Sequence, residues 1–316
     1  PAEGAAALFE AVADEPWSML LDSGAAGSHG GRHDIIVADP MATLTTRGEE
    51  TVIERRDGRE TSAEDPLALL RRELGPLGER PDSIPFAGGA LGYFAYDLAR
   101  RLERLPARAR DAEGIPDMAV GVYDWAVVLD HEQRRAVLAS QGRDPRTRER
   151  FTTLCETFSA PASAVDRRPF RVRGEAVANL DRAGYEAAFA RVKAYLRAGD
   201  CYQVNLAQRF EVAAEGDAWT AFRELRTLNP APFGAFLNLP DVQVLSVSPE
   251  RFLQVDPAGH VETRPIKGTR ARGESPGADR RLAAELAASP KDRAENVMIV
   301  DLLRNDLGRV CRPGSV

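Results

Sequence analysis

Lysine is rare in this chain, and one lysine lies in a setting that suits a chemical role. Only three of the 42 basic residues are lysines, and all the others are arginines. Lysine can lose its proton and act as a nucleophile, whereas the arginine guanidinium stays charged at any working pH. Lys267 follows a strand-like run and precedes Gly268 and Thr269. The alternative is a surface lysine in a turn, and Lys193 and Lys291 show that a retained lysine need not be catalytic.

Three carboxylates and one amide could act beside this lysine. Glu250 follows a proline at the expected end of a strand, which would place its side chain at a cavity or in solvent. Asp292 and Glu295 are three positions apart and share one face of an expected helix. Such a pair can hold a hard cation such as Mg²⁺, or it can simply complement the helix dipole. Gln203 lies on the polar side of an expected strand, which could be a pocket wall or a solvated face.

Composition restricts the class of protein. A chain of 316 residues can bury a large core and is expected to form one large or two intertwined domains. A formal net charge of −6 argues against a nucleic-acid partner, and no apolar run approaches the roughly 20 residues that cross a bilayer. The cysteines at 155, 201 and 311 are widely spaced, as expected of free thiols in a reducing cytoplasm. We therefore expect a cytoplasmic protein without a membrane partner, a hydrolase triad or a zinc site.

The first half of the sequence predicts short strands between turns and one amphipathic helix. The helix is expected at 65–74, where leucines recur at a spacing of three to four. A segment at 158–179 that opens with small residues is expected to link a domain at 1–157 to one at 180–316. Strands rich in β-branched and aromatic residues are expected at 35–38, 51–53, 120–123 and 125–129.

The second half is patterned more sharply. A helix is expected between an N-cap at Asp181 and Gly199, followed by a strand from Cys201 to Val212 with alternating apolar and polar residues. Further strands are expected at 243–248 and 260–266, and the latter would deliver Lys267 at its end. Two helices should follow the polar loop at 270–279, separated by Pro290 and closed by Gly308.

Several motifs, in this order along the chain, resemble those of the chorismate-utilising enzymes, and the resemblance covers nearly the whole sequence. It implies an α+β fold of the anthranilate synthase component I type, with packed antiparallel sheets, helices outside and the active site between the sheets. The motifs are Trp-Ser-Met-Leu-Leu-Asp-Ser-Gly at 17–24, Gly-Gly-Ala-Leu-Gly at 88–92, Pro-Asp-Met-Ala-Val-Gly at 116–121, Gly-Asp-Cys-Tyr-Gln-Val-Asn-Leu at 199–206, Ser-Pro-Glu-Arg-Phe at 248–252, Arg-Pro-Ile-Lys-Gly-Thr at 264–269 and the helix at 292–306.

The resemblance implies a role for each candidate residue. Lys267 would be a nucleophile toward C2 of chorismate, and Glu250 would be the general acid that protonates the departing C4 hydroxyl. Glu295 would bind Mg²⁺, with Asp292 as a weaker candidate. The remaining candidates would bind substrate: Gln203 through its amide, and Gly268 and Thr269 through donors to a carboxylate.

Two positions distinguish branches of this family. Relatives that add water carry a lysine at the position of Gln203, and an amide has no useful basicity, so an amine nucleophile is favoured here. Anthranilate synthases usually carry alanine where this chain has Lys267. The lysine resembles the aminodeoxychorismate branch, in which ammonia attacks C4 and displaces the lysine, on a route to p-aminobenzoate and folate. The ammonia would come from a separate glutamine amidotransferase subunit.

Two alternatives remain open: an anthranilate synthase, or a truncated chain that only binds an aromatic amino acid or the partner subunit. Leu21, Asp22 and Ser23 resemble the part of the fold that binds tryptophan in relatives, where the pocket could be regulatory or structural. The family continues past the equivalent of Val316 through a second metal-binding glutamate. We therefore expect the 316 residues to be incomplete at the C-terminus and inactive alone.

Overall fold

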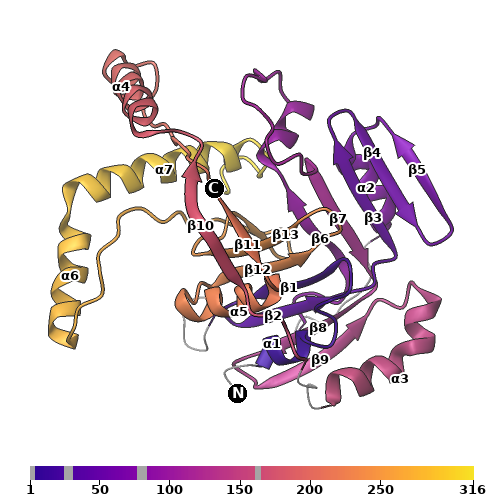
Figure 1. Cartoon of the computed structure of the whole chain (residues 1–316). Helices are drawn as coiled ribbons and strands as arrows, with labels where there is room; N and C mark the ends of the chain where they lie inside the picture. The colour runs from indigo at the N-terminus through magenta and orange to yellow at the C-terminus, as the bar shows by residue number, and fades with distance from the viewer. Residues whose placement is uncertain (1–3, 25–30, 77–83, 161–164) are drawn as a thin grey trace.

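Runs of β-branched and aromatic residues form two antiparallel sheets in the computed structural model, which describes residues 4–24, 31–76, 84–160 and 165–316 (Figure 1). The first sheet, here called sheet A, has the strand order β13-β12-β1-β2-β8-β9, and its neighbouring strands are all antiparallel. Its strands are β1 (Ser18–Asp22), β2 (His33–Val37), β8 (Trp125–Asp130), β9 (Arg135–Ser140), β12 (Phe233–Asn238) and β13 (Gln243–Ser248).

The second sheet, here called sheet B, has the order β5-β4-β3-β7-β6 and is also antiparallel throughout. Its strands are β3 (Ala42–Arg47), β4 (Glu50–Arg55), β5 (Gly58–Ser62), β6 (Gly89–Phe94) and β7 (Met118–Tyr123). Two short ribbons lie apart from both sheets. They pair β10 (Arg171–Ala178) with β11 (Phe210–Glu215) and β14 (Gln254–Val255) with β15 (Val261–Glu262).

Side-chain alternation along the strands of sheet A divides its residues between two cores. Leu20 and Ile36 face an aromatic cluster that includes Phe9 and Trp219, whereas their neighbours in sequence belong to a second core shared with sheet B. Alternation with a period of two is what places successive residues on opposite faces of a sheet. The helices on the outer face of sheet A are α1 (Gly4–Phe9), α3 (Pro145–Ser159) and α5 (Ala218–Leu228).

On the far side of sheet B, α2 (Pro66–Leu74) closes a third core. Leu69 and Leu70 of this helix pack with Leu44 and Ile53 of the sheet. Asp65 caps the helix by accepting from the N–H of Ala68 at 3.2 Å, so the helix expected at 65–74 is confirmed. A 3₁₀ turn, η1 (Tyr96–Arg101), follows β6. The order of layers is therefore helices, sheet A, sheet B, helix.

Local signals correctly predicted helices α4 (Arg182–Ala198), α6 (Pro276–Ala288) and α7 (Pro290–Gly308) of the second half, whereas α5 was not predicted. Asp181 accepts from the N–H of Gly184 at 2.7 Å at the start of α4, and Gly199 ends it with φ = +80°. Further along the chain, α6 begins a few residues before the expected position because Ser275 caps it. Ser289 ends α6 and also caps α7, so the expected break at Pro290 is confirmed.

Two of the expected strands are shorter than the pattern indicated. The stretch 201–209 has no regular structure, and β11 begins only at Phe210. Its partner β10 ends at Ala178, opposite Phe210, so the preceding residues have no neighbouring strand to accept their hydrogen bonds. The strand expected at 260–266 is limited to Val261–Glu262 for the same reason, because β14 offers only two residues. A sequence of alternating apolar and polar residues does not form a strand unless a neighbouring strand pairs with it.

The segment expected as a linker, 158–179, is more structured than its composition suggested. It includes the end of α3 and the whole of β10. Arg167 within it is 8% exposed and pairs with Asp14 at 2.8 Å and Asp217 at 3.1 Å. Sheet A takes β12 and β13 from beyond this segment, so strands from both sides of the expected boundary share one sheet. The division into two domains stays a prediction.

Gln203, Lys267, Asp292 and Glu295 lie on segments outside the two packed sheets. Figure 1 shows α4 and α6 extending away from the sheets. None of the helices α4, α6 and α7 contains a buried residue. No helix in the described part of the chain is long and apolar enough to span a membrane.

Candidate active site

The side chain of the predicted general acid is hydrogen-bonded to the backbone of the residue that precedes the predicted nucleophile. Glu250 follows β13, and its Oε1 accepts from the main-chain N–H of Ile266 at 3.1 Å. Ser248 orders the same turn, because its hydroxyl donates to the carbonyl of Glu250 at 3.1 Å. The carboxylate therefore lies beside the segment that carries Lys267, although the two residues are far apart in sequence.

Lys267 is half-buried at the edge of an open cavity of about 370 Å³. Its Nζ donates to the carbonyl oxygen of Ile266 at 2.9 Å. The cavity lies between the loop before Lys267 and the adjoining ends of α6 and α7. Its lining residues are Pro265, Ile266, Lys267, Leu286, Ala287, Asp292, Arg293 and Asn296.

Gly268 sets how closely this loop approaches the helices. It adopts φ = +78°, a conformation that favours glycine. A Cβ at this position would lie 2.9 Å from Cδ1 of Leu286 and 3.0 Å from Cβ of Asp292. Only glycine therefore lets the backbone after Lys267 reach α7. Thr269, the next predicted substrate donor, is exposed.

The carboxylate of Asp292 forms an ion pair with Arg270, a residue that the sequence analysis did not identify as a candidate. Its Oδ2 lies 3.0 Å from Nη2 of Arg270, and that guanidinium also contacts Glu285 at 3.1 Å. A side-chain hydrogen bond with Ser289, and then Arg270, hold the pKa of Asp292 below its usual value, so the carboxylate is ionised at neutral pH. The one signal in the sequence was the position of Arg270 immediately after the Lys267-Gly268-Thr269 turn.

The predicted Mg²⁺ ligands have the right chemistry but form only part of a coordination shell. Glu295 is half-buried on α7, one turn beyond Asp292. Within the described residues no group of three His, Cys, Asp or Glu side chains is arranged to hold a metal. Mg²⁺ commonly binds one or two carboxylates and keeps water or substrate oxygens as its other ligands. The pair fits such a partial site, with one oxygen of Asp292 already engaged by Arg270.

Gln203 is not brought to the Lys267 cavity, whose lining does not include it. The side chain is half-buried in the irregular stretch before β11, and its Nε2 lies 3.4 Å from Oδ1 of Asn205. Its Oε1 is buried and has no hydrogen-bond partner among the described residues. An unmet acceptor of this kind is unusual in a folded protein and leaves the amide able to bind a donor.

The candidate tryptophan-pocket residues form hydrogen bonds and ion pairs at the end of β1. Asp22 is 3% exposed and Ser23 is 5% exposed, whereas Leu21 is half-buried. Asp22 Oδ2 lies 2.6 Å from Nε of Arg226 on α5. Both the N–H and the hydroxyl of Ser23 donate to Oδ1 of Asp34, each at 2.7 Å. These bonds fix the end of β1 to β2 and α5, and tryptophan binding there stays a prediction.

The candidate residues therefore fall into two sets. Lys267 and Asp292 line one cavity and Gly268 packs close to Asp292, with Glu295 one helical turn away, whereas Glu250 is exposed, does not line this cavity and bonds to the backbone N–H of Ile266. They lie on the turn after β13, on the loop before α6 and at the start of α7.

Comparison with known proteins identifies the family. Residues 18–316 match the model of the chorismate binding enzyme family. The chain is 49% identical over 311 residues to aminodeoxychorismate synthase component 1 of Klebsiella aerogenes, covering 98% of this chain and 67% of that protein. The protein of the same name from Salmonella typhimurium is also 49% identical, with coverage of 98% and 66%. The chain thus spans about two thirds of the length of these curated relatives.

A solved structure supports the same conclusion for the fold. Anthranilate synthase component I from Streptococcus pneumoniae matches with a TM-score of 0.73 and 26% sequence identity, covering 88% of this chain and 62% of that one. The predicted α+β fold of packed antiparallel sheets with helices is therefore confirmed. By the extent and identity of these matches, the chain belongs to the chorismate-binding enzyme family.

Proposed function

We propose that this protein, at its full natural length, converts chorismate and ammonia to 4-amino-4-deoxychorismate and water. The names of its curated relatives support this product, which leads toward p-aminobenzoate and folate. The observation that carries the proposal is the hydrogen bond of Glu250 to the backbone beside Lys267, at the edge of a cavity. It provides a nucleophilic amine and a carboxyl group at one site.

The reaction proceeds in two displacements that conserve the ring carboxylate and the enolpyruvyl group. The uncharged amine of Lys267 forms a bond to C2, the ring double bonds shift, and the C4 hydroxyl departs with a proton from Glu250 as water. Ammonia then forms a bond to C4, the double bonds shift back, and the lysine leaves C2 as a neutral amine. The ammonium formed at C4 returns a proton to Glu250, which restores the starting enzyme.

Glu250 is exposed, and a hydrogen bond fixes one of its two carboxyl oxygens. The N–H of Ile266 occupies Oε1, so the other carboxyl oxygen is the one that would carry the proton to the leaving hydroxyl. General acid catalysis of this kind contributes typically about 10²–10⁴-fold to a rate. Gly268 and Thr269, which follow Lys267, would bind a substrate carboxylate through a backbone N–H and a hydroxyl.

Glu295 and Asp292 would hold Mg²⁺ at the start of α7. The ion, when bound, would neutralise a substrate carboxylate. Arg270, which is paired with Asp292, keeps that carboxylate directed toward the loop of Gly268 and adds a second positive charge close to the substrate. Gln203 would contribute its unmet amide oxygen to substrate binding only if the segment before β11 closes over the cavity.

Ammonia would come from a separate glutamine amidotransferase subunit. Hydrolysis of glutamine by such enzymes needs an activated cysteine thiol. Cys155, Cys201 and Cys311 are all half-buried free thiols in the described structure, and each lies apart in sequence from the four histidines. The names of the relatives, which designate a component 1, support the existence of a second component.

Product identification tests the proposal. The full-length protein would be incubated with chorismate, Mg²⁺ and ammonium, and the products separated and identified by mass spectrometry. Aminodeoxychorismate is the expected product. Anthranilate would keep the family and overturn the role of Lys267. If no product forms, and calorimetry detects tryptophan but not chorismate, the protein is a binding module and not an enzyme.

A further inference from the structure

A second cavity lies at the opposite end of β1 from Asp22 and Ser23, and none of the predicted site residues lines it. Its volume is about 570 Å³, which falls within the range of small-molecule sites. It is bounded by the segment before β1, the turn between β2 and β3, the end of β4 and the first turns of α3. The residues that line it are Glu15, Pro16, Trp17, Asp39, Pro40, Met41, Thr43, Glu54, Arg55, Arg56, Arg146 and Arg150.

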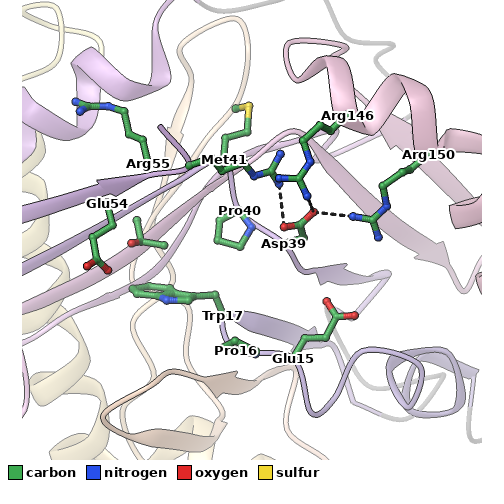
Figure 2. Close-up of a pocket in the computed structure, with 12 residues that line it drawn as sticks. Glu15, Pro16, Trp17, Asp39, Pro40, Met41, Glu54, Arg55, Arg146 and Arg150 are labelled. Atoms are coloured by element: carbon green, nitrogen blue, oxygen red, sulfur yellow. Dashed lines mark hydrogen bonds and ion pairs between the residues drawn. The ribbon is translucent and has the colours of Figure 1, made fainter. Parts of the chain in front are cut away.

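Three arginines on one wall of this cavity share the carboxylate of Asp39, and Arg56 among them also pairs with Asp144. Asp39 accepts ion pairs from Arg56 at 2.8 Å, from Arg150 at 3.0 Å and from Arg146 at 3.8 Å. Arg146 and Arg150 are one turn apart on α3 and about half exposed, and like charges at that spacing repel one another. Figure 2 shows both side chains reaching from the helix toward the single carboxylate. A ligand carboxylate could therefore join Asp39 as a second acceptor.

The opposite wall is apolar and aromatic. In Figure 2 the ring of Trp17 lies below Pro40, and Met41 lies above Pro40 beside the arginines. Trp17 is half-buried, whereas the other two tryptophans, Trp125 and Trp219, are 3% and 1% exposed. An indole face beside a group of guanidinium ions suits a flat apolar body that bears an anionic group.

Both walls depend on strained backbone. Trp17 has φ = +67° and Asp39 has φ = +51°, and among the non-glycine residues of the described chain only Arg134 shares such a conformation. Trp17 is held in place because its N–H donates to the carbonyl of Asn238 and its own carbonyl accepts from the hydroxyl of Tyr123, each at 2.7 Å. Residues held in left-handed conformations cluster at ligand-binding sites. Here two of them meet at one cavity.

The acids on the lining limit the charge of the ligand. Glu15 and Glu54 line the cavity together with Asp39, so a dianion such as phosphate would meet repulsion that a single carboxylate largely avoids. We propose that this cavity binds a small aromatic monocarboxylate, with its ring against Trp17 and Pro40 and its carboxylate bonded to Arg146 and Arg150. This site is separate from the Lys267 cavity and does not depend on the proposed function.

Benzoate is the probe for this site. Binding is measured by calorimetry and by the fluorescence of Trp17, the one tryptophan of the three that is not buried. Benzamide keeps the ring without the charge, acetate keeps the charge without the ring, and inorganic phosphate carries a higher charge. We expect each of these three to bind at least tenfold more weakly than benzoate. Binding of phosphate as tight as that of benzoate would overturn the proposal in favour of a general anion site.

Two variants and a control test the residues. Arg150→Gln should weaken benzoate binding about tenfold, as expected for loss of one charge-assisted hydrogen bond. Arg148→Gln, on the same helix but bonded to the carbonyl of Gly142, should leave it unchanged. Asp39→Asn should instead tighten binding, because it frees the arginines and asparagine tolerates the left-handed conformation. Thermal melting checks that each variant is folded, and unaltered benzoate affinity in both Arg150→Gln and Asp39→Asn would refute the site.

Discussion

The N–H of Ile266 donates to Oε1 of Glu250 at 3.1 Å, and this bond links the turn after β13 to the loop that carries Lys267. The two segments come from opposite sides of the short β14–β15 ribbon, which folds the chain back on itself. Just outside the ribbon, the hydroxyl of Thr263 donates to the carbonyl of Phe252 at 2.7 Å. The ribbon thus places the carboxyl group of Glu250 beside the loop that carries Lys267.

Lys267→Ala should abolish the covalent intermediate, because alanine offers no nucleophile at C2. Ammonia-dependent turnover of chorismate by the full-length enzyme should fall on the order of a thousandfold or more. Lys267→Arg is the matched control, since it keeps the positive charge without a nucleophilic amine and should be equally inactive. Intact-protein mass spectrometry would follow the adduct. Substantial turnover by Lys267→Arg would show that the residue acts through its charge.

Glu250→Gln should lower turnover about 10²–10⁴-fold, because the amide cannot protonate the leaving hydroxyl. The amide oxygen can still accept from the N–H of Ile266, so the stability of the fold should change little. Steady-state kinetics with ammonium and a thermal melt measure the two effects separately. A variant that keeps its rate would remove Glu250 from the chemistry.

Gly268→Ala should destabilise the loop through both its backbone conformation and a clash. The new Cβ would lie within 3.0 Å of Asp292, and alanine at φ = +78° is itself strained. Gly259→Ala is the matched control, because Gly259 has φ = +84° and open space around its Cα. The control should lose about 1 kcal/mol of unfolding free energy, and Gly268→Ala about 1–3 kcal/mol more. Equal losses in urea denaturation would mean that the loop does not pack on α7.

Arg167→Ala should destabilise the protein by about 3 kcal/mol, since it removes a cation that is 8% exposed and leaves the nearly buried carboxylate of Glu10 without it. Arg167 contacts Glu10, Asp14 and Asp217, and Glu10 in turn accepts from Nε1 of Trp219 at 2.6 Å. Arg173→Ala is the control: Arg173 pairs with Glu215 on the exposed β10–β11 ribbon, where a salt bridge contributes about 0–1 kcal/mol. Urea denaturation of both variants makes the comparison. Similar losses would show that the Arg167 cluster does not anchor the segment before β10.

Stability should fall in acid partly through Asp130. Its hydrogen bond with Arg32 and the N–H of Gln133 hold its pKa well below the usual value of about 4. Because the folded pKa is lower than the unfolded one, the stabilisation is complete above about pH 4 and is lost as the pH falls toward the folded pKa. Asp130→Asn should therefore be less stable than the wild type at pH 7, and the difference should shrink toward about pH 3. A difference independent of pH would contradict this assignment.

Local signals in the sequence predicted the elements whose stability is itself local. The helix α4 was predicted correctly because Asp181 and Gly199 provide its caps without help from the rest of the fold. The run from Cys201 to Val212 has equally clear alternation, yet most of it is irregular, because a strand also needs a neighbour and β10 does not extend that far. The composition of 158–179 likewise did not predict the ion pairs of Arg167, because its partners Glu10 and Asp14 are more than 150 residues away in sequence.

The sequence by itself determined the family, strands β2, β4, β7, β8 and β13 of sheets A and B, and the residue types of the candidate site, since motif order, alternation and caps are properties of the chain. Only the tertiary structure decided which of these residues meet. Glu250 reaches the loop of Lys267, Asp292 is held by Arg270, and Gln203 does not join them. The Trp17 cavity gave no signal in the sequence, because its parts come from distant segments and only sheet packing brings them together.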